Sequence, residues 1–504
     1  MTPGCVVALD AGTGSGRAAI FDLEGHLLGL AAEDWTFRVP EDEPLGSEFD
    51  PAQVWATLAR TTRRAMSQAG VVPAAVRAVS VTSQRDGLVF LDGQGRELYC
   101  GTNRDARGVL HAEEIAESFG ERICQVTGRW PLGLGAVGRL WWFRQHRPET
   151  YERVAKLLMI SDWLIYRLCG EFCSEPTNGS SSLLFDIQCH EWSVELAEAL
   201  GFSPAIFPPC AYPGTAAGAL RAPAAADLGL PTGIPVVMGA ADSQAAGLGC
   251  GAFDDGATFA VAGTTLPLQM VLAEPVLDSQ HRLQTGAYLI PNRWVLESNG
   301  GLAGAIYRWF AETFAGDAPD YDQLEQEAAA APAGQVLAVL GPQVADFSCL
   351  RFPPPSLFRF PFLGGIEEPI TRGGFARSIL ESVAYAIRGN LEQVTAVSGR
   401  PAPALRLRSG QALHLCGGLA RSGLLVQIVA DVCERPVRVP VVREASCLGA
   451  AICAAVGAGV FPTLQAGAQA MVRWEQPVEP GPTARRYRRL YSQWRKLLDK
   501  ACDL

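Results

Sequence analysis

The sequence predicts an α/β protein built from two related halves. Short apolar runs that end in turn residues alternate with longer stretches of helical periodicity along the chain. A strand–turn–strand pattern at the start of the chain recurs at residues 258–270, after an apolar run at 234–239 that leads into small residues and Asp242. The length of 504 residues accommodates two large domains. The recurrence places their boundary near residue 250, giving domains at 1–248 and 249–504.

The first half opens with three apolar runs separated by turns, which predicts a β-meander. The expected elements that follow are a helix at 51–69, a strand at 76–82, a hairpin around 92–95 and a mostly helical stretch at 108–170. In the second half, the predicted elements are a helix at 374–397, a strand at 413–416, a strand at 437–441, a small-residue helix at 445–457 and an amphipathic helix that places Tyr487, Leu490, Tyr491, Trp494 and Leu497 on one stripe. Candidate loops include 351–369 and 398–404.

Composition narrows the class of partner. The formal net charge of -10 and the pI near 5.3 disfavour nucleic acid or an anionic membrane as the main partner. The fourteen cysteines include no CxxC pair, which favours reduced thiols over a disulfide framework or zinc site. The chain enters a strand within five residues and has no apolar run of about 18 residues. We therefore expect a cytoplasmic protein that acts on a small molecule.

The glycine-rich turn after the first strand is neither a P-loop nor a GxGxxG motif, because it lacks GK[ST] and has Arg17 at the third glycine position. A β-hairpin fits the spacing better. In such a hairpin the N–H groups of Gly12, Thr13 and Gly14 can converge on phosphate oxygens. Asp10 beside them suits Mg²⁺, bound directly or through water. An ordinary tight hairpin with a capping aspartate explains the same residues.

Three other positions could also take part in binding a nucleotide or in phosphoryl transfer. The turn at Gly263, Thr264 and Thr265 offers a second phosphate hairpin. Asp242, before a helix of small residues, could accept the proton of a substrate hydroxyl, although a helix cap is equally ordinary. A pair of glycines after a strand, Gly417 and Gly418, would let a flat adenine approach the backbone, although many strand–helix packings use glycines in the same way.

Polar residues also gather where strands end. They are Gln84, Arg85 and Asp86 after the strand at 76–82, and Asn103 and Asp105 in TNRDARG. Such residues could hydrogen-bond a polyhydroxylated substrate. Surface ion pairs are the alternative.

Together these motifs resemble the FGGY carbohydrate kinases, members of the actin-like ATPase superfamily, over essentially the whole chain. The matching segments, in family order, are LDAGTGSGR, SQRDG, NRDAR, SDWLIYRLCGE, EPTNGSSSLLFD, GAADSQAAGLG, GTT, TRGGFARSILESVAYAIR and GGLARSGLLVQIVAD. The resemblance implies two ribonuclease-H-like domains with mixed sheets flanked by helices and an active-site cleft between them.

The resemblance also implies the roles of the candidate residues. Asp10 would lie near Mg²⁺ and Asp242 would be the catalytic base. ATP would be bound by Gly12, Thr13, Gly14, Arg17, Gly263, Thr264, Thr265, Gly417 and Gly418, and the substrate by Gln84, Arg85, Asp86, Asn103, Asp105 and Asp242. The cofactors would be ATP and Mg²⁺.

The substrate implied by the resemblance is a small sugar or polyol-like molecule. Within the family, the nearest subgroup acts on the open-chain form of a five-carbon dihydroxy-dione signal, and a pentulose is the alternative. A different class of function is a regulator that binds nucleotide without transferring phosphate. The presence of both Asp10 and Asp242 disfavours it, because such a protein has no need of a catalytic base. The sequence is compatible with a homodimer and does not define the oligomeric state.

Overall fold

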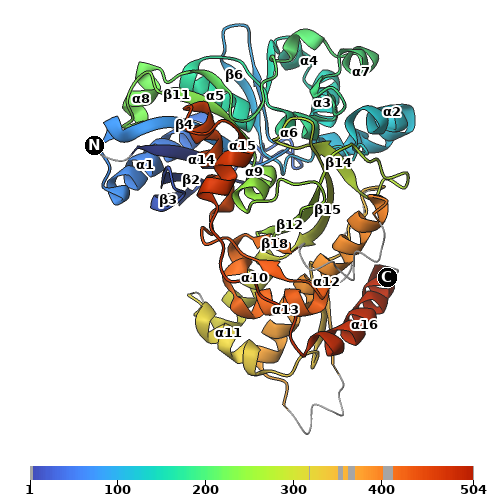
Figure 1. The fold of residues 1–504 in the computed structure, drawn as a ribbon. Helices are drawn as coiled ribbons and strands as arrows, with labels where there is room; N and C mark the ends of the chain where they lie inside the picture. The colour runs from blue at the N-terminus through green and yellow to red at the C-terminus, as the bar shows by residue number, and fades with distance from the viewer. Residues whose placement is uncertain (1–3, 317, 350–355, 361–368, 401–411, 503–504) are drawn as a thin grey trace. The chain divides into compact units, whose positions relative to one another are not determined.

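The structure is a computed structural model that describes residues 4–316, 318–349, 356–360, 369–400 and 412–502. It divides into two compact units (Figure 1). The first comprises Met1–Asp255, Leu272–Val295 and Glu444–Arg473, and the second Gly256–Val271, Leu296–Arg443 and Trp474–Leu504. The units are therefore not simple halves of the chain, because a segment near the C-terminus belongs to the first.

The first unit is built on a six-stranded mixed sheet with the order β10-β11-β4-β1-β2-β3. Its strands are β1 (Cys5–Ala11), β2 (Ser15–Asp22), β3 (Leu27–Asp34), β4 (Val76–Ser83), β10 (Ala216–Ala219) and β11 (Pro235–Ala241). Smaller strands are β5 (Leu88–Leu91), β6 (Glu97–Gly101), β7 (Lys156–Met159), β8 (Phe185–Asp186), β9 (Glu191–Trp192) and β14 (Gln284–Ala287). The β1–β2–β3 meander is antiparallel, whereas β1, β4 and β11 run parallel.

The helices of the first unit pack on this sheet and on the smaller strands. They are α1 (Pro51–Ala69), α2 (Ala112–Thr127), α3 (Ala136–His146), α4 (Pro148–Tyr151), α5 (Ile160–Cys169), α6 (Pro176–Gly179), α7 (Val194–Ala199), α8 (Ala222–Leu228), α9 (Asp242–Gly249), α14 (Ala445–Gly457) and α15 (Leu464–Met471). Val7 and Leu9 of β1 share a core with side chains of α1 and α5. A Cβ at Gly457 would lie 2.4 Å from Val237, whose neighbours Val236 and Met238 belong to that core, so α14 lies on the opposite face.

Helix α14 also crosses α9 at very close range, as Figure 1 shows within the first unit. A Cβ at Gly449 would lie 1.9 Å from the carbonyl oxygen of Ala245, and one at Gly249 would lie 2.0 Å from that of Ala445. Only glycine allows two helix backbones to approach so closely. The small residues of both helices therefore set this crossing.

The second unit repeats the topology of the first. Its strands β12 (Thr258–Val261), β13 (Thr265–Leu272), β15 (Trp294–Leu302), β18 (Leu413–Cys416) and β19 (Val437–Arg438) follow the order β15-β13-β12-β18-β19 in a six-stranded sheet whose remaining strand is β14, and β16 (Leu337–Val339) and β17 (Leu357–Arg359) form a separate pair. Its helices are α10 (Gly304–Ala315), α11 (Tyr321–Ala330), α12 (Arg372–Val397), α13 (Gly423–Cys433) and α16 (Ala484–Cys502). An antiparallel hairpin followed by parallel strands matches β3-β2-β1-β4-β11, so the recurrence in the sequence reflects a repeated fold.

Most predicted elements are confirmed, and some details differ. The stretch 108–170 contains β7, whose four residues pair with β5 and are too short to reveal a strand by periodicity. The strand at 437–441 is limited to two residues, and Leu498 rather than Leu497 lies buried on α16. The predicted loops fall partly outside the described residues, and 351–369 includes β17. No helix in the described part of the chain has the length and apolarity to cross a membrane.

Candidate active site

Three neighbouring strands of the first sheet bring predicted site residues to one edge. β1 and β4 pair in parallel with Asp10 opposite Thr82, and β4 pairs in parallel with β11. Parallel strands present their carboxyl ends at the same edge, where ligands bind in α/β folds. Asp10 near the end of β1, Gln84 just after β4 and Asp242 just after β11 therefore lie along this edge.

Asp10 is a buried carboxylate with one oxygen held in place. Its Oδ2 accepts hydrogen bonds from Nη1 of Arg17 and from Oγ of Ser446, each at 3.2 Å. Its Oδ1 is buried and has no hydrogen-bond partner among the described residues. Burial raises the pKa of Asp10, and the charge of Arg17 opposes that shift. A buried carboxylate oxygen that no donor contacts suits a hard cation or its water shell.

The described residues contain no group of three or more His, Cys, Asp or Glu side chains arranged to hold a metal ion. Asp10 alone is thus an incomplete ligand set. This fits Mg²⁺, which keeps several waters and is usually bound through one or two carboxylates together with substrate phosphates.

Asp242 begins α9 and remains partly exposed. Its Oδ1 accepts hydrogen bonds from N of Ser243 at 2.6 Å and from Oγ of Ser243 at 3.3 Å. Burial raises the pKa of Asp242 to about 6; the charge of Arg85 lowers it and that of Asp10 raises it further. A carboxylate that titrates close to neutral pH is suited to accepting a proton during catalysis.

The first glycine-rich turn is the β1–β2 hairpin that the sequence predicts. N of Gly12 donates to O of Ser15 at 3.1 Å, which closes the turn. Gly14 is exposed and Thr13 half-buried. Oγ1 of Thr13 accepts a hydrogen bond from Nδ2 of Asn103 at 2.9 Å, so its own proton can still be donated to a ligand.

Gln84 fastens this hairpin to the strand beside it. Its Nε2 donates to O of Gly12 at 3.2 Å, and its Oε1 accepts from N of Asn103 at 3.2 Å. The side chain is only 2% exposed. The structure thus brings Gln84 and Asn103 together with the hairpin, whereas their contact with substrate stays a prediction.

Arg85 and Asp86 follow Gln84 just after the end of β4. Arg85 lies close enough to Asp242 to lower its pKa. Asp86 has a φ of 61°, a conformation that is uncommon for residues other than glycine and is frequent at functional sites. O of Asp86 accepts a hydrogen bond from Nη1 of the buried Arg139. The backbone here is therefore held in an unusual conformation by a buried cation.

Asp105 belongs to a buried ion-pair network. Its carboxylate accepts hydrogen bonds from the guanidinium of Arg107, from Oη of Tyr99 at 2.8 Å and from N of Ser47 at 3.3 Å. The side chain is fully buried. These contacts give Asp105 a role in holding the loop that carries Asn103, and its predicted contact with substrate is untested.

The second glycine-rich turn lies between β12 and β13. N of Gly263 donates to O of Thr265 at 3.1 Å, and N of Gly304 at the start of α10 donates to O of Gly263 at 2.9 Å. The side chains of Thr264 and Thr265 are exposed. The turn is thus anchored through its backbone, which leaves both hydroxyls available for a ligand.

Gly417 and Gly418 follow β18 and lie beside this turn. Gly417 has a φ of 91°, and a Cβ there would lie 2.7 Å from the backbone of Ala262. A Cβ at Gly418 would meet no atom within 4 Å. Gly417 therefore serves the packing of the second unit, whereas Gly418 presents open backbone that a flat ring could approach.

Two contributors to the site were not predicted from the sequence. Ser446, at the start of α14, donates to Asp10 from 436 residues away in the chain. Thr177 on α6 accepts a hydrogen bond from N of Ala241, next to Asp242. Thr177 lies in the family segment EPTNGSSSLLFD and Ser446 in the helix predicted at 445–457, but no local pattern indicates what their hydroxyls contact.

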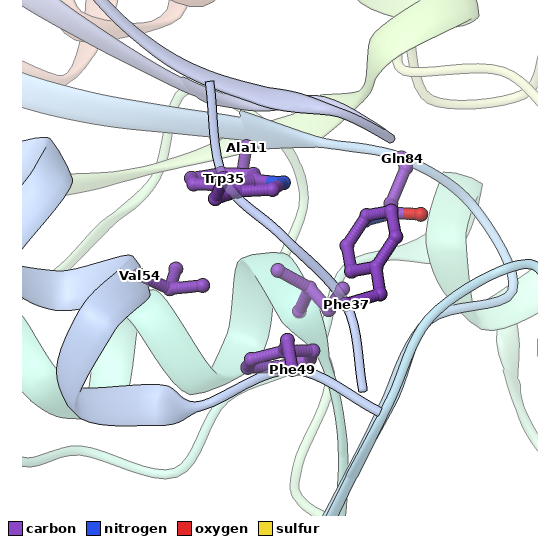
Figure 2. A pocket seen from close by; sticks show the side chains of 7 residues that line it. Ala11, Trp35, Phe37, Phe49, Val54 and Gln84 are labelled. Carbon is purple, nitrogen blue, oxygen red and sulfur yellow. The ribbon is translucent and has the colours of Figure 1, made fainter. Parts of the chain in front are cut away.

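A small apolar pocket lies beside the candidate site (Figure 2). Its lining consists of Ala11, Trp35, Phe37, Phe49, Val54, Gln84 and Ile160. The volume of about 10 Å³ is close to the minimum that holds one water molecule. It is too small for a sugar, so this pocket is a packing feature behind the hairpin.

Two family models match the chain. The model of the N-terminal domain of the FGGY family of carbohydrate kinases matches residues 5–249, and that of the C-terminal domain matches residues 258–458. The chain therefore belongs to the FGGY family of carbohydrate kinases. It is a sugar kinase, an ATP-dependent phosphotransferase acting on a small carbohydrate.

Among similar proteins are two autoinducer-2 kinases. The chain is 33% identical to that of Yersinia enterocolitica serotype O:8 over 490 residues, which cover 94% of this chain and 90% of the relative. It is 32% identical to that of Escherichia coli strain K12 over 493 residues, covering 95% and 90%.

Solved structures share the fold over nearly the whole chain. Xylulose kinase from Rhodospirillum rubrum superposes with a TM-score of 0.81 at 26% identity and covers 98% of both chains. Glycerol kinase from Plasmodium falciparum with ADP gives a TM-score of 0.83 at 18% identity, covering 99% of this chain and 98% of the other. The second likeness shows the fold alone.

Proposed function

We propose that the chain phosphorylates a hydroxyl of open-chain autoinducer-2, a five-carbon dihydroxy-dione, with Asp242 as the general base. The substrate rests on relatives named autoinducer-2 kinase that match 94–95% of the chain at 32–33% identity. The observation that carries the catalytic assignment is the position of Asp242 at the carboxyl edge of β11 with a pKa raised to about 6.

The proposed step is an in-line phosphoryl transfer. The attacking substrate hydroxyl gives its proton to the Asp242 carboxylate as its oxygen bonds to the γ-phosphorus, and ADP leaves. Arg85, whose charge acts on Asp242, and Asp86 next to it in the chain are proposed to orient the substrate, with Gln84, Asn103 and Asp105 holding the loops that carry the site. Positioning supplies most of the rate in such reactions.

Both glycine-rich turns are proposed to contact the phosphates of ATP. Gly12, Thr13, Gly14 and Arg17 would contribute from the first unit, and Gly263, Thr264 and Thr265 from the second. Gly418, with Gly417 beneath it, would lie against adenine, because its backbone is open. Asp10 would hold Mg²⁺, directly or through water. When bound, that ion neutralises charge that develops on the phosphates.

A pentulose is the second candidate substrate. The specific support is the 26% identity with the xylulose kinase of Rhodospirillum rubrum over 98% of both chains. The two candidates differ in chemistry, since a dihydroxy-dione has fewer hydroxyl groups and more carbonyl groups than a pentulose.

A coupled ADP-release assay separates these candidates. The purified protein would be supplied with ATP, Mg²⁺ and, in turn, the dihydroxy-dione, D-xylulose, L-xylulose, D-ribulose and glycerol. The highest kcat/KM is expected for the dihydroxy-dione. A higher value for a pentulose would replace the proposed substrate, whereas slow ADP release independent of any acceptor would indicate a nucleotide-dependent regulator.

A further inference from the structure

The peptide group between Ala240 and Ala241, one residue before Asp242, is held at both ends by threonine hydroxyls. Oγ1 of Thr82 on β4 donates to O of Ala240 at 2.8 Å. N of Ala241 donates to Oγ1 of Thr177 on α6 at 2.7 Å. The carbonyl and the N–H belong to the same peptide plane, so the two hydroxyls fix its orientation.

The two threonine contacts lie where the pairing of β11 with β4 is irregular. The pairing of β11 with β4 shifts register between Val237 and Ala240. Between them, Gly239 approaches β4 so closely that a Cβ would lie 1.7 Å from O of Val81. A register shift of this kind redirects the side chains that follow it. The side-chain hydroxyls thus supplement the ladder at the point where the chain leaves the sheet.

Thr177 is itself oriented by a buried carboxylate. Its Oγ1 donates to Oε2 of Glu175 at 2.7 Å, and Glu175 also accepts from N of Thr177 and N of Asn178 at 2.7 and 2.8 Å. Glu175, Thr177 and Asn178 are all fully buried. A hydroxyl has one proton to donate, so donation to Glu175 turns the lone pairs of Thr177 toward the N–H of Ala241.

We propose that Thr177, oriented by Glu175, is a positioning residue that sets where the Asp242 carboxylate stands relative to the substrate hydroxyl. The proposal rests on the proposed function, in which Asp242 is the base. Thr177 acts through the backbone of Ala241 and is not expected to touch the substrate. Its loss should therefore impair turnover more than binding.

Thr177→Val keeps the shape of the side chain but removes the hydroxyl, and leaves the buried N–H of Ala241 without an acceptor. We expect kcat to fall roughly 10- to 100-fold, while KM for ATP and for the acceptor changes less than about threefold. Thr177→Ser restores the hydroxyl and should recover most of kcat. Thr62→Val is the matched control, because Thr62 is equally buried and donates only to O of Leu58 within α1.

A second measurement is independent of activity. Hydrogen–deuterium exchange, followed by mass spectrometry of a peptide covering residues 236–243, should be faster in Thr177→Val and near wild type in Thr177→Ser and Thr62→Val. If Thr177→Val does not fold, Glu175→Gln serves instead, since an amide oxygen cannot replace both carboxylate oxygens as acceptors; a smaller loss of kcat and faster exchange are expected.

The outcomes for the two proposals are distinguishable. If the wild type phosphorylates an acceptor and Asp242→Asn does not, but Thr177→Val keeps a normal kcat, the positioning role is overturned and the proposed function stands. If Thr177→Val raises KM in proportion to its loss of kcat/KM, or Thr177→Ser fails to recover activity, the positioning role is also overturned. If Asp242→Asn turns over normally, the base assignment itself fails, whatever Thr177 does.

Discussion

Asp10 near the end of β1 and Asp242 just after β11 belong to the two strands that flank β4, so both residues lie at the same edge of one sheet. Burial raises the pKa of Asp242 most, and the negative charge of Asp10 adds to that rise, while Arg85 opposes it. Asp10, in turn, has one oxygen held by Arg17 and Ser446. The two carboxylates therefore suit different roles. Asp10 is held by Arg17 and Ser446, whereas the raised pKa of Asp242 suits it to accept a proton.

The first prediction concerns pH. A general base must be deprotonated to act, and the pKa of Asp242 is raised to about 6. The logarithm of kcat/KM should therefore be level above about pH 7 and fall by one unit per pH unit below pH 6. The measurement is the pH profile of kcat/KM with saturating ATP and Mg²⁺. A level profile down to pH 5 would contradict the base assignment.

The second prediction concerns removal of the base. Asp242→Asn keeps the size of the side chain and cannot take the proton, so kcat should fall about 10²- to 10⁴-fold. ATP binding, measured by isothermal titration calorimetry, should change little, because Asp242 is not proposed to contact the nucleotide. Asp227→Asn is the control, since the carboxylate of Asp227 contacts Trp55 on α1, away from the candidate site.

The third prediction concerns Ser446. Removing its hydroxyl in Ser446→Ala takes away one of the donors to Oδ2 of Asp10 and leaves that of Arg17, so the carboxylate should be less firmly held and should hold Mg²⁺ less well. The apparent dissociation constant for Mg²⁺ in nucleotide binding is expected to rise about tenfold. Ser193→Ala, which removes a helix cap at α7, should leave that constant unchanged. An unchanged Mg²⁺ dependence in Ser446→Ala would rule out the contribution of Ser446.

The fourth prediction contrasts two adjacent glycines. Gly417 has a φ of 91°, and in Gly417→Ala the new Cβ would lie 2.7 Å from the backbone of Ala262. The free energy of unfolding should therefore be about 1–3 kcal/mol lower than that of the wild type. Gly418→Ala meets no atom within 4 Å and should leave the thermal midpoint nearly unchanged while weakening ATP binding. Differential scanning fluorimetry and nucleotide titration test both. Equal ATP affinity in Gly418→Ala and wild type would argue against adenine at this position.

Local chemistry explains how much of the fold the sequence could predict. Apolar periodicity predicts the helix at 51–69, and the structure ends it at the same residues, where Asp50 caps its start and Gly70 adopts a left-handed conformation after its end. The hairpin at Gly12 and the small-residue helix Ala445–Gly457 were likewise evident from turn residues and periodicity. The residues after β1, β4 and β11 could be recognised as site candidates because polar groups at strand ends are conspicuous.

Long-range contacts could not be predicted in the same way. The hydrogen bond between Ser446 and Asp10 depends on where α14 packs, which the crossing of Gly449 over Ala245 decides. Nor does the sequence show that the acceptor of the N–H of Ala241 is Thr177, because no pattern links residues 64 positions apart. The sequence also does not show that Asp105 is buried in contact with Arg107 and Tyr99, because a carboxylate near a strand end can equally be exposed.

Because residues 444–473 belong to the first unit, that unit cannot be complete until they have been synthesised. Strands β1, β4 and β11 leave the ribosome early, yet helix α14, which covers one of their faces, is made only after the strands of the second unit. Until then the apolar face of the nascent sheet lacks its cover, and Asp10 lacks its partner Ser446. The first unit should therefore complete its folding only after residues 444–473 have been made, and fragments that end before residue 444 should need chaperones and bind no nucleotide.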